Sequence, residues 1–185
     1  MIAVFLDRDG TIGGDGGGIH PFEFELYEYA AQSIRILNNA GIKVLLFTNQ
    51  SWIGMGKFSE ETFLKGFELM KKQLEDQHAF LDGLYYCPHK PEDGCLCRKP
   101  KTTLLFEAQK EFGLDFSHCY VVGDRLSDLV AAENVGSKKI LVKTGRGEKT
   151  LVTHNEKASE KLRIDFIADD VLSAAEWIVK DVCSI

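Results

Sequence analysis

The chain has 185 residues, of which 44% are hydrophobic and 27% are charged, and its formal net charge at pH 7 is −6. These values are typical of a globular protein with a sizeable core, and we expect a single domain over residues 1–185. The acidic balance argues against nucleic-acid binding, which needs a basic face. Neither an apolar run of about 20 residues nor a secretory signal is visible, so we expect no membrane association and a cytoplasmic monomer.

Apolar segments of strand-like composition alternate with segments of helical periodicity. Several of the apolar segments lack a polar face, which is typical of parallel strands covered on both sides. Strands are predicted at residues 2–6, 42–47, 83–86, 119–122, 139–142 and 164–168. Helices are predicted at residues 26–39, 59–77, 102–112, 128–135 and 171–182. The alternation predicts an α/β fold with a doubly wound, Rossmann-like parallel sheet. Residues 144–160 are predicted to form a polar, poorly ordered connection.

The first predicted strand ends at two carboxylates, Asp7 and Asp9, which lie two positions apart before a Gly-Thr turn. One carboxylate can attack a phosphorus atom as a covalent nucleophile while the other transfers protons. The alternative is structural, because Asp and Gly are common where a strand turns.

Polar side chains also follow the other predicted strands, where ligands bind in doubly wound sheets. Thr48 and Asn49 can contact a phosphoryl oxygen, and Lys99 can stabilise the charge of a transition state. Crowded carboxylates beside a phosphate favour a divalent cation, and oxygen ligands favour Mg²⁺. Asp124 is the natural further ligand, with Asp128 behind it. Taken singly, each residue could instead be a helix cap or a solvated side chain.

Four segments resemble the sequence motifs of the haloacid dehalogenase (HAD) superfamily: Asp7-Arg-Asp-Gly-Thr11, Thr48-Asn-Gln50, Arg98-Lys-Pro100 and Gly123-Asp-Arg-Leu-Ser-Asp128. The resemblance runs from the N-terminus to about residue 147. It implies that Asp7 is the nucleophile and Asp9 the acid/base, with Thr48 and Lys99 completing the catalytic set. It also implies Mg²⁺ bound by Asp7, by the backbone carbonyl of Asp9 and by Asp124. In the superfamily, an Asp at this position is typical of phosphatases and mutases, whereas the ATPases carry Thr there, so Asp9 favours phosphoester hydrolysis over ion pumping.

The short intervals between these motifs leave no room for the large cap domains that many members of the superfamily insert. We therefore expect an HAD core with no large cap domain and an open site. The glycine-rich segment 13–18 could wrap a phosphate through its backbone amides, or it could simply be a flexible loop.

Cys87, His89, Cys95 and Cys97 lie close together in the chain. Three thiolates and one imidazole make a closed tetrahedral ligand set for a structural Zn²⁺, which would staple the loop 87–97. The Cys-x-His spacing differs from that of ordinary zinc fingers. Scattered free thiols and a redox pair are the alternatives.

This loop is similar to that of a zinc-binding branch of the superfamily, which includes heptose-bisphosphate and histidinol-phosphate phosphatases. Residues 48–58 and 83–89 resemble the heptose enzymes, whereas the short 89–95 interval and Arg125 resemble the histidinol enzymes. The resemblance implies a phosphatase for a small sugar phosphate, with D-glycero-D-manno-heptose 1,7-bisphosphate as the first candidate and histidinol phosphate as the alternative. By position it implies these substrate contacts: Asp15, Gly16, Gly17, Gly18, Asn49, Gln50, Ser51, Arg98 and Arg125.

Two other classes remain open at this level. A phospho-accepting receiver domain is also doubly wound, but it needs its acceptor Asp after the third strand, where this chain has Cys87. A zinc module that binds nucleic-acid ends is disfavoured by the acidic balance.

Overall fold

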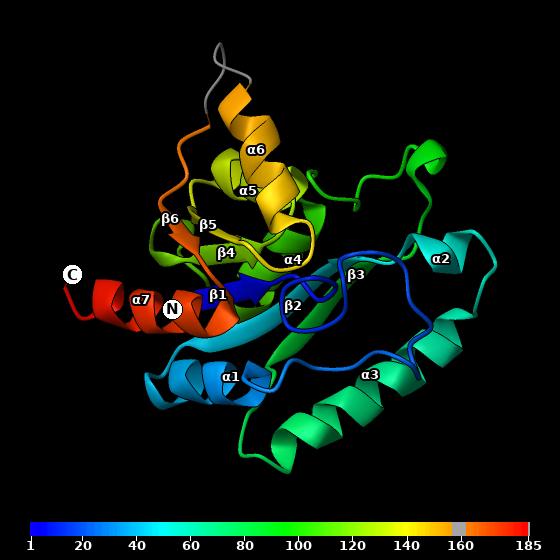
Figure 1. Cartoon of the computed structure of the whole chain (residues 1–185), viewed down its shortest axis with the longest axis horizontal. Coiled ribbons are helices and arrows are strands. Elements are labelled where there is room, and N and C mark those ends of the chain that lie inside the picture. The colour runs from blue at the N-terminus through cyan, green and yellow to red at the C-terminus, as the bar shows by residue number, and fades with distance from the viewer. Residues whose placement is uncertain (157–161, 185) are drawn as a thin grey trace.

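The computed structural model describes residues 1–156 and 162–184, and within them one parallel sheet runs in the order β3-β2-β1-β4-β5-β6 (Figure 1). The predicted doubly wound α/β fold is confirmed. The strands are β1 (Ala3–Leu6), β2 (Lys43–Asn49), β3 (Gly83–Cys87), β4 (Tyr120–Gly123), β5 (Lys138–Val142) and β6 (Phe166–Ala168).

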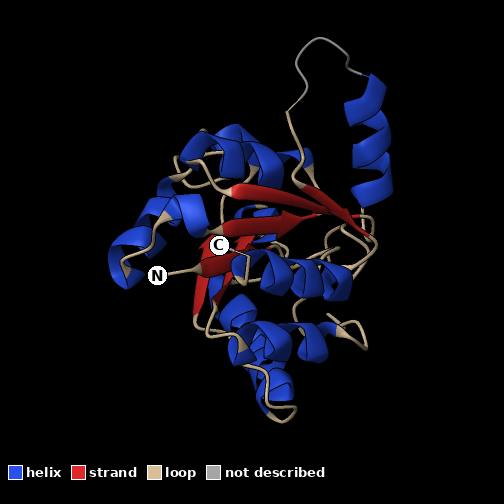
Figure 2. Cartoon of the chain, turned by 90° about the vertical axis from the view of Figure 1, so that its left-hand side faces the viewer, coloured by secondary structure: helices blue, strands red, loops and turns tan. Residues whose placement is uncertain are grey.

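Helices connect the strands and lie on both sides of the sheet (Figure 2). They are α1 (Ala30–Asn39), α2 (Ser51–Gly54), α3 (Glu60–Glu75), α4 (Thr103–Phe112), α5 (Leu126–Val135), α6 (Gly147–Glu156) and α7 (Val171–Val182), with single 3₁₀ turns η1 (Pro91–Asp93) and η2 (Phe116–His118). No described helix has the length and apolar character that crossing a membrane requires.

The central strand β1 separates two apolar layers. Val4 and Leu6 belong to a cluster that includes residues of α1, α3 and α7, whereas Ala3 and Phe5 belong to one that includes residues of α4 and α5. Successive side chains of a strand point to opposite faces, so a strand buried on both faces must be apolar throughout. The uninterrupted apolar run before Asp7 is explained by this position.

The predicted helix ends are partly right. Ser59 begins α3 by accepting a hydrogen bond from the Thr62 N–H at 3.1 Å, as its sequence suggests. The helix predicted from residue 26 begins only at residue 30. Leu26 instead forms a bridge with Gly13, and the Tyr27 N–H donates to the Ile12 carbonyl at 2.9 Å. Because the backbone of residues 26 and 27 bonds to the loop after β1, it does not join α1.

The prediction of a poorly ordered connection at 144–160 is wrong for residues 147–156, which form α6. Gly147 is the helix's only buried residue, and α6 projects beyond the carboxyl ends of the strands (Figure 2). Its polar surface concealed the helical pattern. The Thr150 hydroxyl donates to the Asp124 carbonyl at 2.8 Å and ties α6 to the loop after β4. The last part of the predicted connection, residues 157–160, lies outside the described residues.

The strand order reverses between β1 and β4, which is where doubly wound sheets bind ligands. Leu6 is in register with Val122, and the Asp7 N–H donates to the Val122 carbonyl at 3.0 Å. This register places the residues that follow β1 directly beside Asp124 and the residues after it.

Candidate active site

Three carboxylates meet at the carboxyl ends of β1 and β4. Asp7, Asp124 and Asp128 are all buried, and one oxygen from each lies within 4.8 Å of the others. Asp7 directly follows β1, Asp124 directly follows β4, and Asp128 lies in the first turn of α5. Three buried carboxylates repel one another strongly, so the cluster requires cations to balance it.

Gly10 allows this cluster to close. Its φ of +88° lies in the left-handed region, and a Cβ there would stand 2.2 Å from Asp124 Oδ2. Only glycine combines this backbone conformation with so close an approach. The close approach of Asp124 thus explains why a glycine follows Asp9.

Lys99, in the segment before α4, supplies one balancing cation. Its Nζ lies 2.8 Å from Asp7 Oδ1, 2.7 Å from Asp128 Oδ1 and 2.7 Å from the Phe47 carbonyl. Burial opposes the charged form, but Asp128 and Asp7 outweigh it and raise the pKa of Lys99 above its ordinary value. Lys99 is therefore a fixed cation beside the Asp7 carboxylate.

Asn49, predicted to contact substrate, also holds the backbone of Lys99. Its Oδ1 accepts from the Lys99 N–H at 3.0 Å, and its Nδ2 donates to the Lys99 carbonyl at 3.4 Å. The two segments that meet here are 50 positions apart in the chain.

Asp9 lies apart from the three-carboxylate cluster and forms hydrogen bonds with Arg8 and Gln50. Burial raises the pKa of Asp9 even though Arg8 opposes the shift. A carboxyl group with a raised pKa at a cleft is suited to proton transfer. Thr48 is buried, and its Oγ1 accepts from Gln50 Nε2 at 2.9 Å.

A cleft of about 370 Å³ opens over Asp7 and Asp9. Most of the predicted site residues line it, together with several that sequence reasoning did not find. The lining consists of Asp7, Asp9, Gly16, Gly17, Gly18, Ile19, Asn49, Gln50, Ser51, Trp52, Met55, Pro91, Arg98, Lys99, Arg125 and Ser127. The arrangement is an open, partly cationic cleft that ends on two carboxylates.

Among the predicted catalytic, substrate-binding and magnesium-binding residues, Asp15, Thr48 and Asp124 do not line this cleft. Asp15 is exposed, and its Oδ1 accepts from the Gly17 N–H at 2.8 Å, so its carboxylate shapes the glycine-rich loop. The predicted contact between Asp15 and substrate stays a prediction.

Trp52 is the largest lining residue that the sequence analysis did not single out. The backbone of Gly18 packs closely against its indole, since a Cβ at position 18 would stand 2.0 Å from a ring atom. A lone aromatic residue in a short helix carries no periodic signal, so only the contact with a loop 34 positions earlier reveals it (52 − 18 = 34).

The two arginines of the cleft are held by neutral partners. Arg98 Nη1 donates to Ser51 Oγ at 2.6 Å, and the Arg125 guanidinium donates to the Gly16 carbonyl. Because neither of these bonds neutralises the charge, both guanidinium groups can attract an anionic ligand.

The carboxylate cluster fits Mg²⁺. Asp124 Oδ1 is fully buried and has no hydrogen-bond partner among the described residues, which is costly for an ionised oxygen unless a cation faces it. Hard oxygen donors of this kind favour Mg²⁺. The side chains closest together are those of Asp7, Asp124 and Asp128, whereas the Asp9 side chain is bonded elsewhere. The predicted ligand at position 9, its backbone carbonyl, stays a prediction.

The Asp124 cluster predicts a pH-dependent effect of magnesium on stability. Burial, together with Asp7 and Asp128, raises the pKa of Asp124 to about 8. The folded protein then holds a proton that the unfolded chain has released, so without magnesium the free energy of unfolding should fall between about pH 4 and pH 8. Magnesium needs the ionised carboxylate, so its stabilising effect should grow over the same window.

Thermal unfolding with EDTA and with magnesium at about pH 5 and pH 8 tests this expectation. The increase in Tm caused by magnesium should be larger at the higher pH, and Asp124→Asn should remove most of the difference. Equal increases at both pH values in the unsubstituted protein would contradict it.

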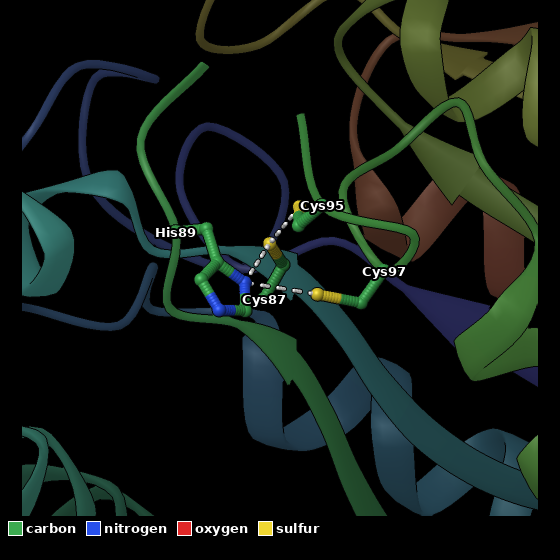
Figure 3. A group of neighbouring side chains, drawn as sticks. All are labelled: Cys87, His89, Cys95 and Cys97. Atoms are coloured by element: carbon green, nitrogen blue, oxygen red, sulfur yellow. Dashed lines mark hydrogen bonds between the residues drawn. The ribbon is translucent and has the colours of Figure 1, made fainter. Parts of the chain in front are cut away.

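A second cluster joins the end of β3 to the following loop (Figure 3). The ligand atoms of Cys87, His89, Cys95 and Cys97 all lie within 4.8 Å of one another. His89 Nδ1 lies 3.2 Å from Cys97 Sγ, and Cys87 Sγ lies 3.5 Å from Cys95 Sγ. Bonds of about 2.3 Å to sulfur and 2.0 Å to nitrogen place tetrahedral Zn²⁺ ligands at similar separations. The cluster is compatible with the predicted structural zinc.

This cluster is covalently continuous with the catalytic region. Cys97 directly precedes Arg98 and Lys99, and the Arg98 guanidinium donates to the His89 carbonyl at 3.5 Å. The Lys101 ammonium donates a hydrogen bond to the Cys95 carbonyl, and the Thr103 hydroxyl donates to the Leu96 carbonyl at 2.7 Å. These bonds tie the loop to the start of α4 and to the residues just before it. The loop therefore positions two basic residues of the cleft.

Comparison with known proteins agrees with this geometry. A family model described as HAD-hydrolase-like matches residues 96–174. The chain is 42% identical, over 85% of its length and 90% of the relative, to a protein of Haemophilus ducreyi named D-glycero-beta-D-manno-heptose-1,7-bisphosphate 7-phosphatase. The chain belongs to the HAD phosphatases. A relative of the same name from Photorhabdus laumondii is 40% identical over 90% of this chain and 92% of its own.

A solved structure supports the same family assignment. The D,D-heptose 1,7-bisphosphate phosphatase of B. bronchiseptica, complexed with magnesium and phosphate, superposes with a TM-score of 0.87 at 31% identity. The match covers 98% of this chain and 99% of that one. The family assignment does not support a receiver domain, and β3 indeed runs into the cysteine cluster rather than into an acceptor Asp.

Proposed function

We propose that this protein is a magnesium-dependent phosphatase that removes the 7-phosphate of D-glycero-β-D-manno-heptose 1,7-bisphosphate through an aspartyl-phosphate intermediate. The observation that carries the chemistry is the placement of Asp7 and Asp9 at the end of one cleft, with Lys99 bonded to Asp7. The relatives' names carry the choice of substrate.

In the first half of the reaction, an Asp7 oxygen forms a bond to the phosphorus while the bond from phosphorus to the sugar oxygen breaks. Asp9 donates a proton to the departing sugar oxygen, which would otherwise leave as an unstable alkoxide. Lys99, held 2.8 Å from Asp7 Oδ1, stabilises the negative charge that spreads over the phosphoryl oxygens.

In the second half, the ionised Asp9 removes a proton from a water molecule, which attacks the phosphorus of the Asp7 acyl phosphate. Phosphate leaves, and Asp7 returns as a carboxylate. Bound Mg²⁺, held by Asp7, Asp124 and the Asp9 carbonyl, with Asp128 adjacent, would neutralise the phosphate and favour the ionised form of Asp7. Burial, with a contribution from Asp128, otherwise raises the pKa of Asp7 although Lys99 opposes the shift.

The basic residues of the cleft favour a substrate with more than one anionic group. Lys99 is engaged by two carboxylates, whereas Arg98 and Arg125 bond to neutral groups and remain free to pair with phosphate. We propose that these arginines, with the amides of the loop 16–18, recognise the phosphates of the bisphosphate. The zinc cluster would hold Arg98 and Lys99 in place and would take no part in bond making.

The experiment that tests this function compares substrates for phosphate release with magnesium present. The heptose 1,7-bisphosphate should be hydrolysed with the highest kcat/KM, and phosphorus NMR should show a product that retains its 1-phosphate. Histidinol phosphate should be a poor substrate because it carries a single phosphate and an ammonium group, which the guanidinium groups of Arg98 and Arg125 would repel. Faster hydrolysis of histidinol phosphate would move the substrate assignment to that activity, and no release from either would overturn the proposal.

A further inference from the structure

Arg8, which lies between the two catalytic carboxylates in the chain, is a buried cation. Its side chain is only 3% exposed. The guanidinium carbon lies 4.6 Å from the ring centroid of Phe24 and 5.4 Å from that of Phe63. A charge in such an apolar environment is retained only when an anion and several hydrogen bonds compensate it. The Arg8 side chain is therefore oriented by the rings of Phe24 and Phe63 and by the anion that faces it.

The anion that faces Arg8 is Asp9, and the contact is a fork. Arg8 Nε lies 3.2 Å from Asp9 Oδ2, and Arg8 Nη2 lies 3.2 Å from Asp9 Oδ1. Two parallel bonds between planar groups fix the rotation of the carboxylate as well as its position. Lysine, with one ammonium group, cannot fix that rotation.

Gln50 completes the arrangement from the segment after β2. Its Oε1 accepts from Arg8 Nη2 at 3.2 Å, and its Nε2 donates to Asp9 Oδ2 at 3.0 Å and to Thr48 Oγ1 at 2.9 Å. The two bonds in opposite senses to Arg8 and Asp9 settle the orientation of the amide. Arg8, Asp9 and Gln50 thus form a closed ring of three mutually bonded side chains.

The ring leaves one acceptor position of the Asp9 carboxylate open. A carboxylate has about four acceptor positions, two on each oxygen. Oδ2 accepts from Arg8 and Gln50, and Oδ1 accepts from Arg8 alone. The remaining position is on Oδ1, and the side chain, 15% exposed, lines the cleft.

We infer that Arg8 is a positioning residue, which rotates the Asp9 carboxylate so that Oδ1 exchanges the proton with the leaving group and with water. This inference rests on the proposed function, because it concerns the proton donor of that reaction. Arg8 does not touch the reacting atoms. Its contribution is confined to the steps in which Asp9 gives or takes a proton.

The inference makes the effect of an Arg8 substitution depend on the leaving group. A sugar alkoxide needs a proton as its bond to phosphorus breaks, whereas 4-nitrophenolate is stable enough to leave without one. Loss of a positioned acid should therefore slow transfer from a sugar phosphate by roughly 10²-fold. Formation of the Asp7 acyl phosphate from 4-nitrophenyl phosphate should change by less than about threefold, since that step needs no proton donor.

Rapid-mixing measurements on Arg8→Met and Arg8→Lys, with magnesium present, test this dependence. With 4-nitrophenyl phosphate each variant should release about one nitrophenolate per chain in a fast burst and then turn over slowly, because Asp9 no longer activates water efficiently. With the heptose bisphosphate the first turnover itself should be slow. Arg8→Lys keeps the buried charge, so it serves if Arg8→Met does not fold.

Two controls separate positioning from general damage. Arg35→Met removes an exposed arginine that donates to the Gln77 carbonyl at 3.1 Å, and it should leave both substrates unaffected. In an Asp9→Asn background, Arg8→Lys should cause no further loss, because a residue that acts through Asp9 has nothing left to position.

Equal losses on both substrates, a further loss in the Asp9→Asn background, or full activity of Arg8→Lys on the sugar phosphate would each overturn the inference. The activity of the unsubstituted protein distinguishes failure of this inference from failure of the proposed function. If it hydrolyses the bisphosphate and the Arg8 variants match it, only the positioning role fails. If it hydrolyses neither substrate, the proposed function itself fails.

Discussion

Replacing Asp7 with asparagine is expected to lower the rate of phosphate release by on the order of 10⁴-fold or more, because an amide cannot form the acyl phosphate. The fold should survive. Lys99 would keep its 2.7 Å contacts with Asp128 and the Phe47 carbonyl. One negative charge would be removed from a buried cluster of three, so the Tm measured with EDTA should not fall and should rise if repulsion dominates.

The measurements are initial rates of phosphate release with magnesium and thermal unfolding without it. The matched control is Asp169→Asn, which removes an exposed carboxylate paired with Lys143 at 2.8 Å and should leave the rate unchanged. Radiolabelled phosphate from 4-nitrophenyl phosphate, whose leaving group needs no proton, should be trapped on the chain in Asp9→Asn and should be absent from Asp7→Asn. A rate for Asp7→Asn within tenfold of the unsubstituted protein would exclude the covalent mechanism.

Removing the zinc-compatible cluster is the second large perturbation. Purified protein should contain about one zinc ion per chain, and Cys97→Ser should release it. We expect the Tm to fall by on the order of 10 °C, since a loss of a few kcal/mol shifts the Tm of a chain of this size by that amount. Activity should fall roughly tenfold or more as well, because Arg98 and Lys99 directly follow Cys97.

Cys183→Ser is the control for this experiment, because Cys183 is an exposed cysteine outside the cluster. It should keep the zinc content, the Tm and the rate. Metal analysis, thermal unfolding and phosphate release on the same preparations test the three effects together. Protein that is fully active and stable without zinc would show that hydrogen bonds such as those of Lys101 and Thr103 are enough to order the loop.

The sheet could be predicted because burial on both faces leaves a signature in single strands. Residues 3–6 are apolar without interruption, and each is fully buried. α6 could not be predicted, because it buries only Gly147 and so shows no apolar stripe. The start of α1 was also missed, since the bridge from Leu26 to Gly13 is a long-range backbone contact that local periodicity does not record.

Part of the candidate site could also be predicted from the sequence. Asp7, Asp9, Asn49 and Lys99 were expected near one another because parallel strands end at the same edge, and the structure brings them to one cleft. Gln50 was expected to contact substrate, yet its amide is bonded to Arg8, Asp9 and Thr48. Residue type alone cannot reveal such a partition of hydrogen bonds.

The amino-acid sequence by itself determined which chemical groups follow each strand, and hence that carboxylates, a lysine and a thiol-imidazole set would be available. Only the tertiary structure decided how they are paired: Lys99 with Asp7 and Asp128, Gln50 with Arg8 and Asp9, and Gly18 against Trp52. The physical reason is the separation of the interacting residues along the chain. Strand composition and caps are local, whereas these pairings join segments up to 92 positions apart, and their geometry exists only after the sheet order has brought the segments together.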